Sequence, residues 1–221
     1  MDRSRGMLAA LVPCVLLACG APSPVPLAPS TAASVPVAPA ALDPARYHVL
    51  MVSGGGVPQI NYSSHLVHLQ RLRDLLLASG IRPEQINILA SDGADPAPDL
   101  AQRDAPPEAD FWLVESTRVG QRLDTPVELV SSSIPGVSLA PATKTSVGKW
   151  FDAQGRGLRA GDVLLLYVTD HGTRQSDDPL DNQITLWGKD KDDSLSVREL
   201  QTALGALDPG VRVVTLMSQC F

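Results

Sequence analysis

Six consecutive apolar residues, Val163 to Val168, constrain the fold of this chain more than any other feature. A strand that is apolar at every position is buried on both faces, as in the middle of a parallel sheet. The polar sequence Thr169-Asp170-His171-Gly172 follows this run directly. A second, largely apolar run, Val211 to Met217, is followed by Ser218-Gln219-Cys220. The two runs predict buried strands whose carboxyl ends carry polar residues.

The remaining pattern alternates strands with helices. Shorter strands are predicted at 48–52, 86–89 and 184–187. Leucines at helical spacing from Leu66 to Leu77, followed by Gly80, predict a helix, and further helices are predicted at 146–153 and from the capping box at 196–199 to Leu204. This order predicts an α/β fold with a mostly parallel sheet and helices on both faces. In such sheets the ligand site lies beyond the carboxyl ends of the strands.

The chain divides into three segments by composition. Residues 1–19 carry two arginines and then an apolar run that is too short to span a bilayer, as in a signal peptide. Residues 20–44 are rich in proline and alanine and predict an extended, disordered tether. Residues 45–221 form the predicted folded domain, and residues 90–143 within it form a long irregular insertion with one candidate strand at 111–115.

The end of the signal segment, Leu16-Leu17-Ala18-Cys19-Gly20, resembles a bacterial lipobox. This resemblance implies cleavage before Cys19 and attachment of two or three acyl chains to this residue, which anchors the protein to a membrane. Because no Asp follows Cys19, the resemblance implies the outer membrane of a bacterial cell envelope. The alternative is an ordinary secretory signal that contains Cys19 by chance.

Charge and cysteine content narrow the function. A net charge of −6, without a basic patch that contains aromatic residues, argues against a nucleic-acid binder. Of the three cysteines, Cys14 leaves with the signal peptide and Cys19 is the predicted lipid acceptor. Cys220 then has no partner for an internal disulfide. It is either a reactive thiol or a passive residue of the core.

His171 and Cys220 form a candidate catalytic pair. His171 precedes Cys220 by 49 residues, and each lies at the carboxyl end of a predicted strand. A histidine beside a thiol takes its proton and raises the fraction of nucleophilic thiolate. The backbone N–H groups of Gly172 and Cys220 are candidates for an oxyanion hole in acyl transfer.

The same residues resemble a known family. The block Leu166 to Gly172, which ends in Thr-Asp-His-Gly, is similar to the catalytic-histidine block of legumain-type asparaginyl endopeptidases, relatives of caspases, gingipains and separase. The block Met217 to Cys220 resembles their catalytic-cysteine block. Asn61-Tyr62 resembles their Asn-Tyr pair, and the sequence 81–86 is similar to the stretch that leads into their second strand.

The resemblance implies a caspase-like three-layer sandwich and a peptidase mechanism. Cys220 is then the nucleophile, His171 the acid and base, and Asn61 the residue that orients the imidazole. The substrate is a peptide or protein, and neither a metal ion nor an organic cofactor is required. We therefore expect a cysteine endopeptidase that is held to a membrane through Cys19.

Some residues depart from the family pattern. Ser63-Ser64 stand where the family has Arg-His, and Ser218 replaces a Glu, so a preference for cleavage after Asn does not carry over. The domain is expected to be truncated after the Cys220 strand, because family members continue beyond it. An inactive, membrane-tethered binding lipoprotein with a peptidase-like fold and a transamidase of similar geometry are the alternatives.

Overall fold

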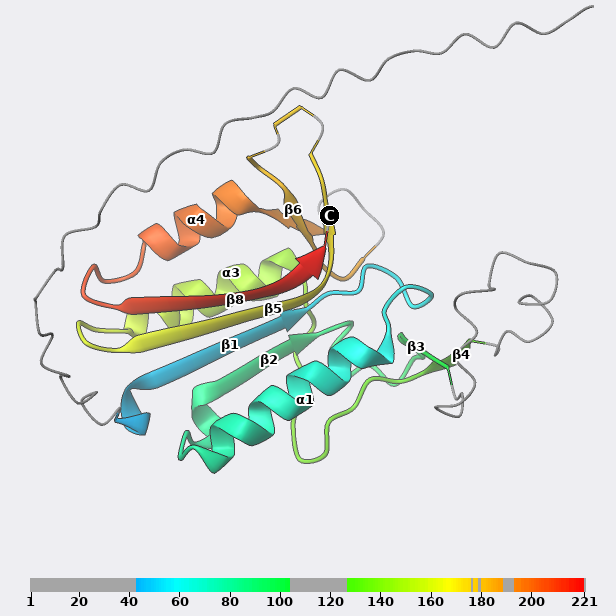
Figure 1. Ribbon diagram of the computed structural model, residues 1–221, viewed down its shortest axis with the longest axis horizontal. Coiled ribbons are helices and arrows are strands. Elements are labelled where there is room, and N and C mark those ends of the chain that lie inside the picture. Colours follow the sequence, from blue (N-terminus) through cyan, green and yellow to red (C-terminus); the bar gives the residue numbers. More distant parts are fainter. Residues whose placement is uncertain (1–42, 104–126, 176, 179, 189–192, 221) are drawn as a thin grey trace, which may run out of the picture. The chain divides into compact units, whose positions relative to one another are not determined.

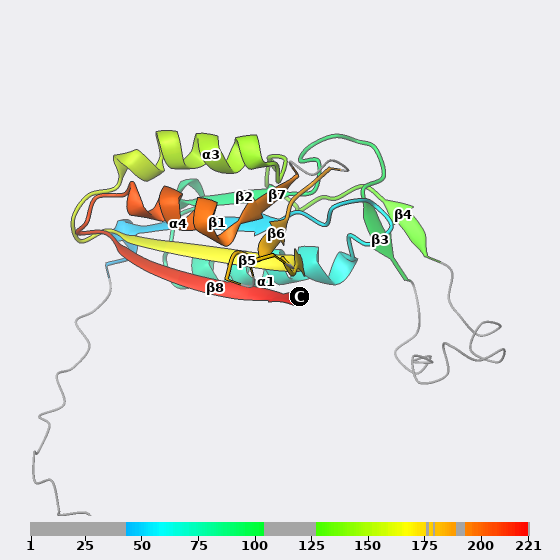
Figure 2. The same cartoon turned by 90° about the horizontal axis from the view of Figure 1, so that it is seen from above.

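The computed structural model shows a mixed α/β domain (Figures 1 and 2). The residues described are 43–103, 127–175, 177–178, 180–188 and 193–220. Among these residues, no helix combines the length and the apolar character needed to cross a bilayer. The expected signal peptide, Cys19, most of the tether and the candidate strand at 111–115 lie outside the described residues.

Four parallel strands form the centre of the sheet in the order β2-β1-β5-β8 (Figure 1). They are β1 (Tyr47–Ser53), β2 (Ile86–Ala90), β5 (Val163–Thr173) and β8 (Arg212–Cys220). All four strands were predicted from their apolar runs. The prediction that β8 is buried is wrong, because Val213, Val214, Leu216 and Met217 are exposed, and consecutive residues of a strand lie on opposite faces. The expectation of a mostly parallel sheet is confirmed, and the finer caspase-like arrangement stays a prediction.

The strand β5 is longer than its apolar run. It continues through the polar residues Thr169 to Gly172 as far as Thr173, because both of its edges find partners there. On one edge it pairs with β8 up to His171, and on the other Gly172 pairs with Ile184 of the antiparallel strand β6 (Gln183–Thr185). The strand β6 in turn pairs with β7 (Ser194–Ser196), which the sequence analysis did not predict.

Helices cover both faces of the sheet, as predicted (Figure 2). Met51 belongs to one apolar cluster with Leu69 of α1 (Ser63–Ala78). Its neighbour Leu50 belongs to a second cluster with Trp150 of α3 (Lys144–Ala153), on the face that also receives α4 (Val197–Gly205). Because successive side chains of a strand point to opposite faces, β1 contributes to both clusters.

The helix boundaries follow local signals in the sequence. In α4, the Ser196 hydroxyl accepts a hydrogen bond from the Glu199 N–H at 3.1 Å, and the Glu199 carboxylate accepts one from the Ser196 N–H at 2.9 Å. This is the predicted capping box. Gly80 follows α1 with φ 88°, a left-handed conformation that glycine adopts without steric cost.

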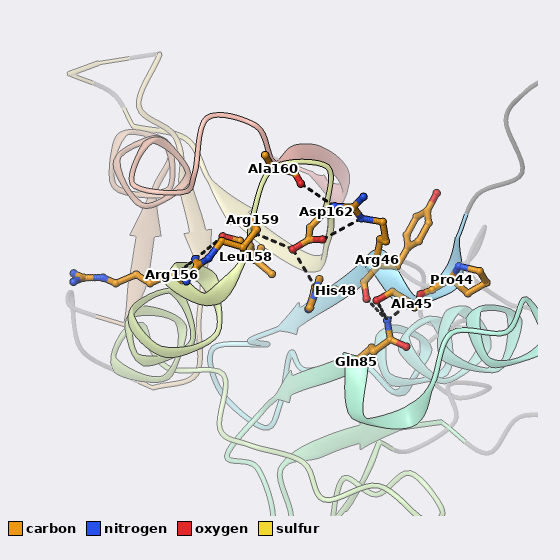
Figure 3. Close-up of polar contacts among 11 residues, drawn as sticks. Pro44, Ala45, Arg46, His48, Gln85, Arg156, Leu158, Arg159, Ala160 and Asp162 are labelled. Atoms are coloured by element: carbon orange, nitrogen blue, oxygen red, sulfur yellow. Dashed lines mark hydrogen bonds and ion pairs between the residues drawn. The ribbon is translucent and has the colours of Figure 1, made fainter.

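A polar cluster joins the beginnings of the strands (Figure 3). The Arg46 guanidinium donates to Ala160 O at 2.8 Å and to Asp162 Oδ1 at 3.4 Å. Asp162 Oδ2 accepts from the Arg159 N–H, and this bond, with smaller contributions from Arg46 and His48, lowers the pKa of Asp162. Since Asp162 O also accepts from the Arg212 N–H, this cluster fixes where β1, β5 and β8 begin.

The predicted insertion is not wholly irregular. Its described parts contain the antiparallel strands β3 (Leu100–Gln102) and β4 (Glu128–Val130). Polar contacts connect this pair to the sheet, because the Ser132 N–H donates to Asp99 Oδ1 and the Ser91 and Ser132 hydroxyls lie 3.1 Å apart. Strands of three residues leave too short a pattern to be seen in the sequence.

Asp92 in this segment provides a test of stability. Burial, with a further contribution from the charge of Asp99, raises the pKa of Asp92 to about 6. The protonated form is therefore favoured in the folded state, so this contribution to stability is complete below pH 4 and is lost as the pH rises through about 6. We expect Asp92→Asn to raise the free energy of unfolding at pH 7 by on the order of 1 kcal/mol, an amount reduced by solvent screening.

Urea denaturation at pH 7 and at pH 4 measures this effect. The control is Asp74→Asn, since Asp74 is exposed on α1 and pairs with Arg73 at the surface, where an ion pair contributes little. The gain from Asp92→Asn should shrink at pH 4. An equal gain at both pH values would contradict the assignment.

Candidate active site

The carboxyl ends of the central strands meet at one edge of the sheet, as predicted. Ser53 at the end of β1 is the partner of Thr169 in β5, and Thr169 is also the partner of Ser218 in β8. Two residues further along, His171 is the partner of Cys220. Neighbouring strands lie about 4.8 Å apart, so the backbones of His171 and Cys220 are adjacent.

The imidazole of His171 is oriented by a backbone carbonyl. Its Nε2 lies 2.9 Å from Ile60 O, which can only accept a hydrogen bond. Nε2 therefore carries the proton of the neutral ring, and Nδ1 is left with a free lone pair. The edge of the ring also meets Tyr62, with centroids 5.7 Å apart. In this orientation, Nδ1 is the atom available to accept a proton.

Asp170 lies next to the imidazole of His171, with Oδ1 3.6 Å from Nε2, and its side chain is fully buried. Its Oδ2 accepts a hydrogen bond from the Ser53 hydroxyl at 3.1 Å, and its Oδ1 accepts one from the His171 N–H at 2.8 Å. Burial raises the pKa of Asp170, while the nearby His65 and His171 act in the opposite direction. Its φ of 102° is strained for a residue with a Cβ.

His65, in the first turn of α1, completes a cluster that the sequence analysis missed. Its Nδ1 lies 3.1 Å from Thr169 Oγ1, and its Nε2 lies 3.8 Å from Asp170 Oδ1. Burial is the main cause that lowers the pKa of His65, so its imidazole is neutral at pH 7. The only signal in the sequence was a histidine close to Asn61-Tyr62, and nothing local connects it with β5.

Asn61 is buried beside this cluster but makes its hydrogen bonds elsewhere. Its Nδ2 donates to Ser91 Oγ and to Asp99 O, both at 2.7 Å. No hydrogen bond between Asn61 and His171 is found among the described residues, and the imidazole donates to the preceding carbonyl of Ile60 instead. The predicted role of Asn61 as a direct partner of His171 therefore stays a prediction without a supporting contact in this structure.

The glycines after β1 permit the close approach that holds Asn61 in place. Gly55 has φ 74°, and a Cβ at this position would lie 2.3 Å from the Asn61 side chain. A Cβ on Gly54 would lie 2.3 Å from Thr185 O. These contacts explain the glycine run as a packing requirement of the loop.

The structure also locates the other predicted residues. Gly172 lies within β5, beside Ile184 of β6, and the oxyanion-hole function of the Gly172 and Cys220 N–H groups stays a prediction. An open groove beside the candidate site is lined by Tyr62, Ser63, Ser64, Ala101, Arg103 and Val127. Ser63 and Ser64, which stand where the resembled family has Arg-His, therefore face this groove.

Asp170 provides a second test of stability. Asp170→Ala removes the acceptor of two buried donors and keeps the strained φ, whereas Asn tolerates positive φ and retains an acceptor without the buried charge. We expect the free energy of unfolding of Asp170→Ala, measured by urea denaturation at pH 7, to be about 2 kcal/mol lower than that of Asp170→Asn. Equal stability of the two variants would contradict this account of Asp170.

The raised pKa of Asp170 also predicts how the stability of the protein changes with pH. The group contributes stability that is complete below pH 4, and this contribution is lost as the pH rises above that range. The amide of Asp170→Asn does not titrate, so its stability contribution does not change with pH. The free energy of unfolding of this variant should therefore rise relative to that of the wild type as the pH increases. Paired urea titrations across this range measure the difference.

Comparison with known proteins gives no family for this chain: no family model and no curated protein matches it. The functional conclusion therefore depends on the residues themselves, and above all on the pairing that brings His171 beside Cys220.

Proposed function

We propose that this protein is a cysteine endopeptidase in which Cys220 is the nucleophile and His171 is the general base. The observation that carries the proposal is the register of β5 and β8, in which these two residues are direct partners at the carboxyl edge of the sheet. The order of the residues and their similarity to the legumain-type blocks support the same conclusion.

The tautomer of His171 fits this chemistry. Because Nε2 donates to Ile60 O, Nδ1 accepts the proton of the Cys220 thiol. The thiolate attacks the peptide carbonyl carbon, and the imidazolium then protonates the leaving amine. Water, activated by the same Nδ1, hydrolyses the thioester and regenerates the thiol. The N–H groups of Gly172 and Cys220 are the proposed donors to the oxyanion.

The proposed substrate is an extended peptide. The groove beside Tyr62 lies next to the imidazole and provides a surface for the residues that flank the cleaved bond. Since Ser63 and Ser64 line it in place of the Arg-His of the resembled family, cleavage after Asn is not part of the proposal.

The proposal also places the protein on a membrane. The lipobox-like sequence predicts acylation of Cys19, and the Pro/Ala-rich residues 20–44 would hold the domain away from the bilayer. The proposed location is the outer membrane of a bacterial cell envelope.

A fluorescent peptidyl acyloxymethyl ketone, which alkylates activated cysteines, tests the catalytic pair. We expect it to label the wild type, not to label Cys220→Ala, and to label His171→Ala on the order of 100-fold more slowly, since the thiol then lacks its base. His48→Gln is the matched control, because His48 lies at the opposite end of β1 beside Asp162.

Circular dichroism of each variant separates loss of reactivity from loss of fold. Equal labelling rates of the folded wild type and the folded His171→Ala variant would contradict the peptidase proposal and would favour the inactive binding lipoprotein. Peptide ligation products in place of hydrolysis would identify a transamidase instead.

Metabolic labelling with radioactive palmitate in a bacterial host tests the anchor. Cys19→Ser should abolish both the label and sedimentation with membranes, because no acyl acceptor remains. Cys14→Ser should retain both, since Cys14 would be removed with the signal peptide. If the wild type and Cys19→Ser were labelled to the same extent, Cys19 would be ruled out as the acceptor.

A further inference from the structure

We propose that His65, Asp170 and His171 form a three-ligand site for a divalent transition-metal ion such as zinc. The three residues come from α1 and β5, and one ligand atom of each lies within 4.8 Å of the others. This site goes beyond the proposed peptidase function, which uses only one of its members.

The distances between the ligand atoms fit a small ion. Asp170 Oδ1 lies 3.8 Å from His65 Nε2 and 3.6 Å from His171 Nε2. A tetrahedral zinc ion with bonds of about 2.0 to 2.2 Å keeps its ligand atoms roughly 3.3 to 3.6 Å apart. The two distances to Asp170 therefore need to shorten by a few tenths of an ångström. The two imidazoles, whose ligand atoms lie within 4.8 Å of each other, must also approach to give three protein ligands with a fourth position left for water.

Neighbouring side chains orient two of the ligands. The Thr169 hydroxyl holds His65 Nδ1 at 3.1 Å, which leaves Nε2 of the ring directed at Asp170. The Ser53 hydroxyl donates to Asp170 Oδ2, so Oδ1 is the oxygen that remains close to both imidazoles. Outer hydrogen bonds of this kind are typical of metal sites, where they fix the tautomer and the rotation of each ligand.

The electrostatic environment favours a cation at this point. The Asp170 side chain is 0% exposed, and the two nearby imidazoles are the only ionisable groups of the described residues that act on its pKa. Ile60 O adds a further partial negative charge 2.9 Å from His171 Nε2. A buried carboxylate without a full positive partner is costly, and a bound cation removes that cost.

The ligand types select the class of metal. Two imidazoles and one carboxylate suit zinc and similar transition metals, whereas calcium and magnesium prefer sites made of oxygen atoms alone. The neutral state of His65 leaves a lone pair available for coordination.

Metal binding and the proposed catalysis exclude each other through the tautomer of His171. An ion on Nε2 replaces the proton that is donated to Ile60 O, which requires the ring to turn away from this carbonyl, and the ring proton of a neutral imidazole then resides on Nδ1. Nδ1 can no longer accept the thiol proton. This consequence rests on the proposed function, but the site itself does not.

Isothermal titration of the full chain with zinc chloride, after treatment with a chelator and without a polyhistidine tag, tests the site. We expect one zinc ion per chain with a Kd below about 1 μM, and a Kd at least about 30-fold weaker in His65→Gln or Asp170→Asn. His48→Gln is the matched control, because His48 lies at the opposite end of β1 beside Asp162 and should leave the Kd unchanged.

Absence of zinc binding by the folded wild type, or equal Kd values for wild type and His65→Gln, would overturn the proposal. Circular dichroism verifies the fold of each variant. Titration of Cys220→Ala separates this proposal from the peptidase proposal: zinc binding should persist without the thiol, whereas its loss would show that the three ligands do not suffice. Suppression of probe labelling by zinc in the wild type tests the link between the two.

Discussion

The parallel pairing of β5 with β8 is the interaction on which the candidate site depends. It runs from the partners Val163 and Arg212 to the partners His171 and Cys220, and the hydrogen bond from Arg212 N–H to Asp162 O fixes where it begins. A shift of one residue would turn every side chain of β8 to the opposite face and would separate His171 from its partner. The hydrogen bond at one end of the sheet thus helps to fix the pairing of the residues at the other end.

Asp170 is the residue at which the candidate site is energetically most unfavourable. Its carboxylate is buried, its backbone is strained at φ 102°, and it is surrounded by Ser53, His65 and His171. Such strain is retained where the surrounding structure over-determines a conformation, and it is common at functional sites. The same carboxylate explains why two histidines from different elements converge, and it connects the proposed peptidase chemistry with the proposed metal site, although the sequence analysis expected no metal.

Much of the fold was predictable because burial leaves a periodic pattern. The apolar runs located β1, β2, β5 and β8, and the Ser196–Glu199 capping box located the start of α4. The patterns failed where strands are short, as in β3, β4 and β7, and where β5 continues through polar residues. At those places the backbone is extended because another strand offers it hydrogen bonds, and the residues of the short strand itself do not indicate that partner.

The sequence by itself determined the longer strands and helices, their order, and that His171 and Cys220 lie near the carboxyl ends of two strands. Only the tertiary structure decided that those strands are direct neighbours, that Ile60 O and not the Asn61 side chain contacts the imidazole, and that His65 joins Asp170. The physical reason is one of range. Apolar runs and capping boxes are patterns of a few neighbouring residues. Strand register and the convergence of loops depend instead on segments that can lie more than a hundred residues apart, such as β1 and β5.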